Sequence, residues 1–269
     1  MKTLIYQVKV GPNPPKFYDT CIDSVTKYCV KYNIEHFVQT EPALKIRPVN
    51  SFRSKEAVER FGYLPIYEKE NAFTCLGDYD KVAIIDSDIF IRDQAPNIFE
   101  HLEDEYDFGG VLERDLPATE LYIKKIRAYT KGQYGPLTDV DWKWDPKSGG
   151  EFFNMGLMVM NKSILKYLNG MTPKEFITQP AYEKFVNGEG AWKWSTDQTL
   201  LNYWVKKSGM KYKTMDWRWN GLFKAVKDNM ICESYFIHFF LSSRLPKGGD
   251  EIKLIVDNLD LAKLLPGRG

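Results

Sequence analysis

The sequence predicts an α/β fold built on a single, mostly parallel sheet with helices on both faces. Short apolar runs that suit strands alternate with longer segments of helical periodicity, which is the pattern of strands joined by crossover helices. The run Lys81–Ile85 is almost continuously apolar, as expected for a central strand covered on both sides. No repeat or low-complexity segment interrupts the 269 residues, so we expect one compact domain.

The first part of the chain contains three expected strands and three expected helices. Thr3–Val10 alternates in polarity and runs into Gly11–Pro15, which indicates a strand followed by a loop. Phe17–Tyr32 places apolar residues at helical spacing, and a proline at position 65 suits the first turn of a later helix. The other expected elements are a strand at 35–39, helices at 54–61 and 65–76, and the strand at 81–85.

The second part has strand signals separated by a long polar segment. Phe108–Leu112 and Phe152–Asn161 are strand-like, whereas Leu116–Trp144 is mixed in composition and suggests a loop-rich insertion with one helix. Thr196–Lys207 has a helical pattern, with Ser195 or Thr196 as its expected N-cap. A late strand at 235–240 and an amphipathic helix at 251–265 complete the expected order.

Composition narrows the functional classes. The 37 basic and 36 acidic residues give a net charge of +1, which does not favour a nucleic-acid partner. The four cysteines show no CxxC spacing, so we expect buried thiols in a reducing compartment. No apolar run is long enough to span a membrane, and the N-terminus lacks the pattern of a signal peptide. We therefore expect a cytoplasmic protein.

Asp86 and Asp88 are the strongest chemical signal in the chain. Two like charges at the end of a buried strand are costly unless something compensates them, and ligands of open α/β sheets bind at such strand ends. Two carboxylates suit a hard divalent cation. The structural alternative is a turn cap at Asp88 with a satisfied carboxylate at Asp86. Two further Asp-x-Asp pairs, at 78/80 and 139/141, lie in polar segments and are expected to be solvated.

Two enzyme classes place an Asp-x-Asp pair after a strand. Phosphatases of the haloacid dehalogenase type require Thr or Val two residues after the second Asp, where this chain has Phe90, and they carry the motif near the N-terminus. Nucleotide-sugar transferases instead use the pair to hold Mn²⁺ or Mg²⁺ against a diphosphate. The order of four segments favours the second class: LPIYEKENAFTCLGDYDKVAIIDSDIFI (64–91), FFNMGLMVMN (152–161), STDQTLLNYW (195–204) and IHFF (237–240).

Together these segments resemble the retaining GT-A glycosyltransferases of the glycogenin and lipopolysaccharide galactosyltransferase family, over about residues 1–247. The resemblance implies a GT-A domain at 1–250, with a nucleotide-binding half at about 1–100 and an acceptor half at about 101–250. A C-terminal helix and tail follow at 251–269. It also implies Mn²⁺ or Mg²⁺ as cofactor, held by Asp86, Asp88 and His238. A histidine in the strand YFIHFF would otherwise be expected in the core.

The resemblance extends to residues around the two substrates. It implies catalytic roles for Asn154, Asp197 and Gln198, although Asp197 also suits a helix N-terminus as a simple charge. The implied donor-binding residues, beside the two aspartates, are Gln7, Lys69, Ser87, Gly156 and Lys247. The family's Lys-Pro-Trp after the histidine is missing, so Lys247 or Arg244 is expected to substitute.

Three tryptophan pairs suggest a carbohydrate surface. Trp142/Trp144, Trp192/Trp194 and Trp217/Trp219 suit either core packing or platforms under sugar rings, and nearby aspartates favour at least one platform. Trp217, Trp219 and Asn220 are the expected acceptor-binding residues. The sequence thus predicts a metal-dependent transferase that moves a sugar from a UDP-sugar to a carbohydrate hydroxyl, with retention. The alternatives are an inverting transferase or nucleotidyltransferase of the same fold, and a non-catalytic carbohydrate-binding protein.

Overall fold

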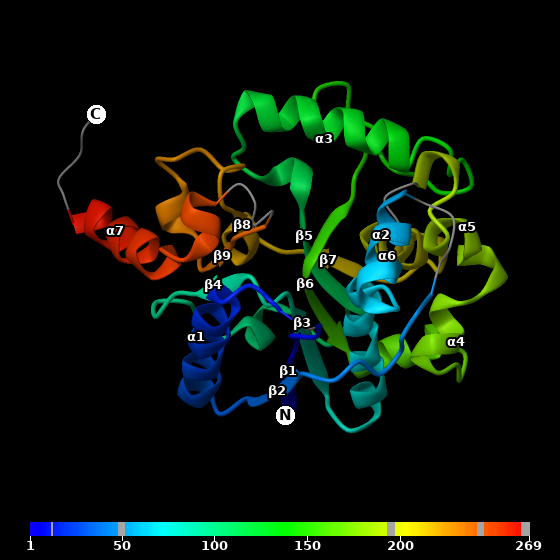
Figure 1. The fold of residues 1–269 in the computed structure, drawn as a ribbon, viewed down its shortest axis with the longest axis horizontal. Helices are drawn as coiled ribbons and strands as arrows, with labels where there is room; N and C mark the ends of the chain where they lie inside the picture. Colours follow the sequence, from blue (N-terminus) through cyan, green and yellow to red (C-terminus); the bar gives the residue numbers. More distant parts are fainter. Residues whose placement is uncertain (12, 48–51, 193–196, 241–244, 265–269) are drawn as a thin grey trace.

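The computed structural model describes residues 1–269 except 12, 48–51, 193–196, 241–244 and 265–269. Its centre is a six-stranded sheet in the order β2-β1-β3-β6-β5-β7 (Figure 1). The β1/β2, β1/β3 and β5/β7 pairings are parallel, whereas β6 runs antiparallel to both β3 and β5. The strands are β1 (Thr3–Val8), β2 (Glu35–Gln39), β3 (Lys81–Ile85), β5 (Phe108–Leu112), β6 (Phe153–Asn161) and β7 (Tyr212–Thr214).

A second, smaller sheet was not expected from the sequence. It consists of β4 (Ile89–Ile91), β9 (Phe236–His238) and β8 (Gly221–Leu222), in the order β4-β9-β8. Strands of two or three residues carry no measurable periodicity, which is why the sequence pattern showed only one of them and extended it to 235–240. The expectation of a single sheet is therefore corrected, while the α/β class with a mostly parallel central sheet is confirmed.

Helices cover both faces of the central sheet. The α-helices are α1 (Phe17–Tyr32), α2 (Phe52–Phe61), α3 (Glu120–Gln133), α4 (Pro173–Ile177), α5 (Glu183–Val186), α6 (Asp197–Lys207) and α7 (Ile252–Leu264). The main 3-10 segments are η1 (Pro65–Gly77), η2 (Ile98–His101), η3 (Glu113–Asp115), η4 (Lys162–Tyr167), η7 (Trp217–Asn220) and η10 (Pro246–Gly249). Shorter 3-10 turns are η5 (Pro180–Tyr182), η6 (Gly190–Trp192) and η8 (Ile231–Glu233). The segment after Pro65 is thus a 3-10 helix at the expected place.

Alternate residues of the central strands feed two separate cores. Leu4 and Tyr6 of β1 pack in one apolar cluster with η1, α4 and α6, and Ile5 packs in the other with α1 and α7. This alternation follows from the two-residue period of a strand. Both faces of the sheet are therefore covered, which explains the continuous apolar run of β3. None of the described helices is long and apolar enough to cross a membrane.

Candidate active site

The carboxyl end of β3 and the small sheet together bring close three side chains that could hold a metal ion. Asp86 and Asp88 follow β3 directly, and β4 then pairs antiparallel with β9 so that Ile89 lies opposite His238. The backbone N–H of Phe239 donates to the carbonyl of Asp88 at 2.8 Å. One ligand atom from each of Asp86, Asp88 and His238 lies within 4.8 Å of the others. The fold thereby brings His238 beside Asp86 and Asp88, although it lies 150 positions after Asp88 in the sequence.

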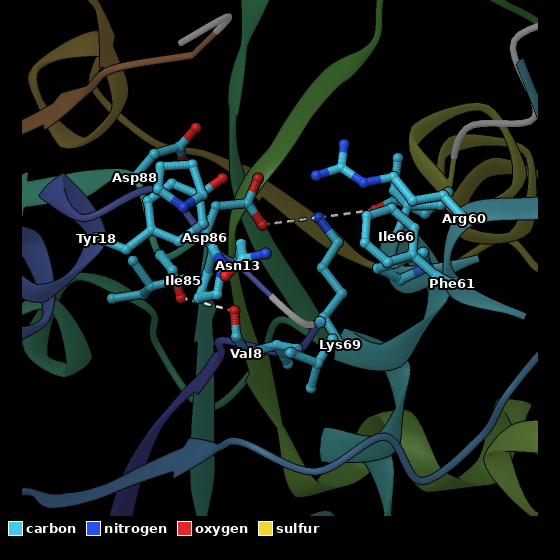
Figure 2. A pocket seen from close by; sticks show the side chains of 17 residues that line it. Val8, Asn13, Tyr18, Arg60, Phe61, Ile66, Lys69, Ile85, Asp86 and Asp88 are labelled. Carbon is cyan, nitrogen blue, oxygen red and sulfur yellow. Dashed lines mark hydrogen bonds and ion pairs between the residues drawn. The ribbon is translucent and has the colours of Figure 1, made fainter. Parts of the chain in front are cut away.

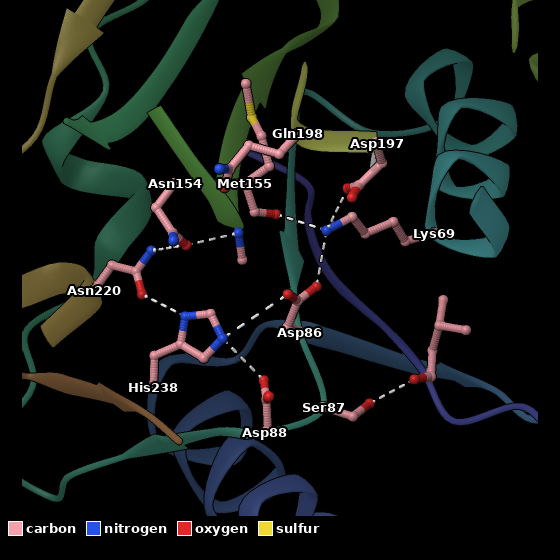
Figure 3. Close-up of polar contacts among 12 residues, drawn as sticks. Lys69, Asp86, Ser87, Asp88, Asn154, Met155, Asp197, Gln198, Asn220 and His238 are labelled. Atoms are coloured by element: carbon pink, nitrogen blue, oxygen red, sulfur yellow. Dashed lines mark hydrogen bonds and ion pairs between the residues drawn. The ribbon is translucent and has the colours of Figure 1, made fainter. Parts of the chain in front are cut away.

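Asn220 fixes the orientation of the His238 ring (Figure 3). His238 Nδ1 lies 3.0 Å from Asn220 Oδ1, an acceptor, so Nδ1 carries the ring proton. His238 Nε2 then faces Asp88 Oδ1 at 3.1 Å and Asp86 Oδ2 at 4.0 Å. In a neutral imidazole, a nitrogen lone pair would therefore face two carboxylate oxygens. The arrangement is favourable only with a cation at Nε2, either a proton or a metal ion.

The facing charges of His238 and Asp88 shift the pKa values of both side chains. Burial acts to lower the pKa of His238, but the Asp88 carboxylate and then Asp86 outweigh it and raise this pKa above its ordinary value. Burial acts to raise the pKa of Asp88, but the facing imidazole lowers it overall. Within the described residues, no hydrogen bond of good geometry reaches the buried Asp88 Oδ1. This orphaned oxygen and the imidazole nitrogen fit a divalent cation that accepts oxygen and nitrogen ligands.

Asn154 belongs to a buried amide network rather than to an open surface. Its Oδ1 accepts from the Gly156 backbone N–H at 3.1 Å and from Asn220 Nδ2 at 2.9 Å. Its Nδ2 donates to Glu113 Oε1 at 2.6 Å, and Tyr122 Oη donates to Glu113 Oε2 at 3.1 Å. Burial raises the pKa of Glu113 despite these two hydrogen bonds. The network leaves Asn154 with one N–H for a ligand.

Gly156 is required by the histidine. A Cβ at this position would lie 2.4 Å from His238 Cε1 and 2.8 Å from Nδ1, closer than packing allows. We expected this glycine to let a ligand approach the backbone. The structure gives it a different use, because the missing side chain makes room for the imidazole ring.

Lys69 connects the metal-ligand group to Asp197. Its Nζ lies 3.0 Å from Asp86 Oδ1, 2.7 Å from Asp197 Oδ2 and 2.8 Å from the carbonyl of Met155 (Figure 3). The ammonium hydrogen-bonds to Asp86 and the Met155 carbonyl, and forms an ion pair with Asp197. Burial acts to lower the pKa of Lys69, but Asp197 and Asp86 raise it overall, so the ammonium stays charged.

Glu70 lies buried beside this pair and has no hydrogen-bond partner among the described residues. Burial and then the charge of Asp197 raise the pKa of Glu70 well above its ordinary value. Burial also raises the pKa of Asp197, although Lys69 opposes this shift. Gln198 completes the group: its Oε1 accepts from Met155 N–H and its Nε2 donates to Tyr129 Oη, both at 3.3 Å.

The carboxylates of Asp86, Asp88 and Asp197 line a cavity of about 450 Å³ (Figure 2). Its wall includes Gly11 and residues 13–15 of the loop after β1, Tyr18 of α1, and Arg60 and Phe61 at the end of α2. Ser87 lines it as well, with its Oγ donating to the carbonyl of Val8 at 2.7 Å. Figure 2 shows the Arg60 guanidinium extending toward the side of the cavity where Lys69 and Asp86 lie. Lys69 and Arg60 are the cationic side chains among the described lining residues.

Three expected donor-binding residues, Gln7, Gly156 and Lys247, do not line this cavity. Gln7 is fully buried, with Oε1 at 2.9 Å from His36 Nε2 and Nε2 donating to the carbonyl of Asp86 at 3.4 Å, so it supports the Asp86 backbone instead of contacting a base. Lys247 is exposed on η10 and its Nζ pairs with Glu251 at 2.6 Å. Arg244, the alternative to Lys247, lies outside the described residues.

The expected acceptor platform is also corrected. Trp219 is 2% exposed and packs on His101, Tyr235 and Phe236, so no face of its ring is available to a sugar. Asn220 is fully buried in the network with His238. Trp217 is partly buried against the same core. Segments distant in sequence bury these residues, so the sequence around them gives no sign of their burial.

Three contributors to the site were missed by sequence reasoning: Arg60, Glu70 and Glu113. Arg60 lies in a polar helix where arginine is ordinary, so nothing marked it. Glu113 directly follows the buried strand β5, and this position relative to a strand end is the same signal that identified Asp86. Glu70 lies between Lys69 and Asn71 in a charged part of the chain, so nothing local marked it as a buried residue.

Comparisons with known proteins support the fold. No protein-family model and no curated protein sequence matches the chain. Among solved structures, a glycosyltransferase involved in glycosylation of the major capsid of PBCV-1 matches 94% of this chain and 100% of its own, with 12% identity and a TM-score of 0.50. An active-site mutant of LgtC matches over 99% of this chain and 97% of its own, with 13% identity and a TM-score of 0.51. The chain therefore has the GT-A glycosyltransferase fold.

Proposed function

We propose that this protein is a metal-dependent glycosyltransferase that moves a sugar from a nucleotide-diphosphate donor, UDP being the expected nucleotide, to a hydroxyl of a carbohydrate acceptor. The observation that carries the proposal is the convergence of Asp86, Asp88 and His238, of which the two aspartates line a cavity of about 450 Å³, in a chain with the GT-A fold. Strand-end carboxylates with a late histidine are the arrangement that the sequence resemblance implied.

The charge of the cavity supports a divalent cation. Its described wall carries the carboxylates of Asp86, Asp88 and Asp197 against the cations of Lys69 and Arg60. A diphosphate would be repelled by this surface, since Lys69 is already paired with two of the carboxylates. Asp86, Asp88 and His238 would hold Mn²⁺ or Mg²⁺, which neutralises the diphosphate and its developing charge when bound.

Arg60 is the donor anchor that the arrangement favours over Lys247. Its guanidinium is exposed, lines the cavity, and lies over the ring of Phe61 with its carbon 4.8 Å from the ring centroid. A guanidinium binds phosphate oxygens in a bidentate manner, so it can replace the lysine that the missing Lys-Pro-Trp would supply. Lys247, by contrast, has a carboxylate partner within its own turn.

Asp197, Gln198 and Asn154 are proposed to act on the sugar. As the bond to the diphosphate breaks, positive charge develops on the sugar ring, and a fixed carboxylate and fixed amides favour that state over the ground state. Lys69 pairs with Asp197 and favours its ionised form, while Gln198 is held between Met155 and Tyr129. We propose retention of configuration, in line with the resemblance. In the inverting alternative, Asp197 would serve as the general base.

A thermal-shift panel of nucleotide sugars with and without Mn²⁺ tests the proposal. A donor present at about 100 times its dissociation constant should raise the free energy of unfolding by about 2.7 kcal/mol, and only when the metal is present. The same samples should then release UDP on addition of an oligosaccharide acceptor. Binding of oligosaccharide that is indifferent to Mn²⁺, without UDP release, would identify a non-catalytic carbohydrate-binding protein instead.

A further inference from the structure

Trp144 is the most exposed of the described tryptophans, with 49% of the residue accessible. Its neighbour Trp142 is buried, with Nε1 donating to the carbonyl of Leu137 at 3.0 Å. The candidate active site does not use Trp144, and the main apolar clusters do not include it. A single exposed hydrophobic side chain is ordinary on a protein surface, so the meaning of this indole depends on its surroundings.

The segment that carries Trp144 is held firmly. Asp145 Oδ1 accepts from the backbone N–H groups of Lys147 and Ser148 at 2.9 and 2.7 Å, and Asp145 pairs with Gly149 through two backbone hydrogen bonds. Gly149 has a φ of +87°, and a Cβ there would lie 2.4 Å from Thr130 Oγ1, so the turn is packed closely onto α3. The indole in turn covers Gly150, where a Cβ would lie 3.2 Å from its ring. The ring is thus fixed in one orientation with its outer part exposed.

The indole borders a hollow of about 440 Å³ between this turn and α3. Arg127 and Lys131, one helical turn apart on α3, supply two cations to the same hollow. Neither forms an ion pair with a carboxylate in the part of the chain that the structure describes; Arg127 only donates to the carbonyl of Pro146 at 3.4 Å. The hollow therefore combines an aromatic face with two cations and one carboxylate, that of Asp145, whose Oδ1 is already bound by the backbone N–H groups of Lys147 and Ser148.

We propose that this hollow binds an acidic carbohydrate, namely a residue of the acceptor chain that carries a carboxylate. The C–H face of a pyranose buries well on an indole, and the guanidinium and ammonium groups recognise the carboxylate. A fixed ring and turn reduce the entropy lost on binding. The inference rests on the proposed function for the identity of the occupant, and it names an acidic acceptor where the active site alone specifies only a hydroxyl.

The position of the hollow suits a chain that also reaches the active site. The hollow is bordered by Arg127 and Lys131, and Tyr129 between them is directed to the inner side of α3, where its hydroxyl accepts from Gln198. One helix thus contacts both the proposed catalytic amide and the proposed carbohydrate hollow. A site of this kind would hold a polymer while its end is extended, which increases the effective concentration of the acceptor end.

Calorimetry with two trisaccharides tests the site directly, without donor, metal or turnover. The probes are trigalacturonic acid, which is acidic, and maltotriose, which is neutral. We expect the wild-type protein to bind trigalacturonic acid, and Trp144→Ala to weaken that binding by about tenfold or more. Lys131→Gln should weaken binding of the acidic probe and leave any binding of the neutral probe unchanged, and added salt should act in the same direction.

Two variants on the same helix serve as matched controls. Leu121→Ala removes an exposed apolar side chain and Lys125→Gln an exposed charge, and neither residue borders the hollow. Both should bind trigalacturonic acid within about twofold of wild type, since they leave the contact surface intact. The proposal would be overturned if the wild-type protein bound neither trisaccharide, or if the control variants lost as much affinity as Trp144→Ala. It would also be overturned if inorganic phosphate competed equally well for the site and Trp144→Ala bound trigalacturonic acid as wild type does. UDP binding with Mn²⁺, measured on the same samples, separates this result from the proposed activity.

Discussion

Asn220→Ala is the substitution that best separates two roles for this residue. The sequence resemblance implied contact with the acceptor, whereas the structure places Asn220 behind His238, with Oδ1 at 3.0 Å from Nδ1 and Nδ2 at 2.9 Å from Asn154 Oδ1. Removing a hydrogen-bond partner of a metal-ligating histidine typically weakens the metal by about 10- to 100-fold. That range corresponds to about 1.4 to 2.7 kcal/mol of binding free energy. We expect the Mn²⁺ dissociation constant of Asn220→Ala to rise by this factor.

Isothermal titration of Mn²⁺ measures the effect, and two further variants control it. Asn220→Asp keeps an oxygen opposite Nδ1 and should recover most of the metal affinity. Asn161→Ala removes a buried amide at the other end of β6 that bonds two backbone carbonyls, so it should also destabilise the fold by about 1 to 3 kcal/mol without changing Mn²⁺ binding. An unchanged Mn²⁺ constant in Asn220→Ala, together with a raised acceptor KM, would refute the positioning role and restore the acceptor role.

The other predictions concern the metal, the donor, pH and stereochemistry. Asp86→Asn, Asp88→Asn and His238→Ala should each abolish metal-dependent UDP binding in calorimetry while circular dichroism stays unchanged; full Mn²⁺-dependent activity in His238→Ala would exclude it as a ligand. Arg60→Ala should weaken the UDP-sugar by about tenfold or more, as expected for loss of a charge-assisted hydrogen bond, and Lys247→Ala should not; the reverse result would restore Lys247. The pKa of His238 is raised in the folded protein, so its protonation stabilises the metal-free fold at low pH. This stabilisation is lost as the pH rises through that pKa. The affinity for Mn²⁺ should increase over the same pH range, because the metal replaces the proton. The difference in metal-free unfolding free energy between wild type and His238→Gln isolates the contribution of this protonation. A difference that grows as the pH rises would contradict the prediction. Proton NMR of the product should give the donor's anomeric configuration, and an inverted product would favour Asp197 as base.

The elements that the sequence predicted well are those whose signal is local. The run at Lys81–Ile85 is continuous and apolar because both faces of β3 are buried, and the carboxylates after it lie at the edge where the fold binds ligands. Asp86 and Asp88 could therefore be chosen from three Asp-x-Asp pairs on local grounds. His238 could not, since an aromatic strand gives the same pattern in a core; only the order of motifs along the chain selected it.

The roles that differ from expectation depend on contacts between distant segments. Gln7 has the polarity of a ligand-binding residue, but β2 pairs beside it and His36 satisfies its amide inside the protein. Trp219 matches a sugar platform by type, yet the strand β9 and η2 supply residues that cover its ring. Residue type indicates what a side chain can do. Which partner it meets is set by the tertiary fold, and no window of sequence around Gln7 or Trp219 contains that information.

The role of Lys69 also depends on a contact between distant segments, and a double-variant experiment can test that contact. Residue types alone assign Lys69 to donor binding and Asp197 to turnover, and independent roles predict additive losses in kcat/KM. The structure places Lys69 Nζ 2.7 Å from Asp197 Oδ2, so removing Lys69 leaves the buried Asp197 carboxylate unpaired, which costs about 3 to 5 kcal/mol. Removing Asp197 leaves Lys69 with Asp86 as its remaining ion-pair partner. Asp197→Asn should lower turnover by about a hundredfold, the scale of losing one strong electrostatic group. Lys69→Met should lower turnover as well, because the Asp197 carboxylate that Lys69 holds is displaced or protonated.

We therefore expect the double variant to lose less than the sum of the two single losses, by at least about 1 kcal/mol in both unfolding free energy and kcat/KM. Additivity within about 0.5 kcal/mol would mean that the two residues act separately, and that Lys69 contacts the donor directly.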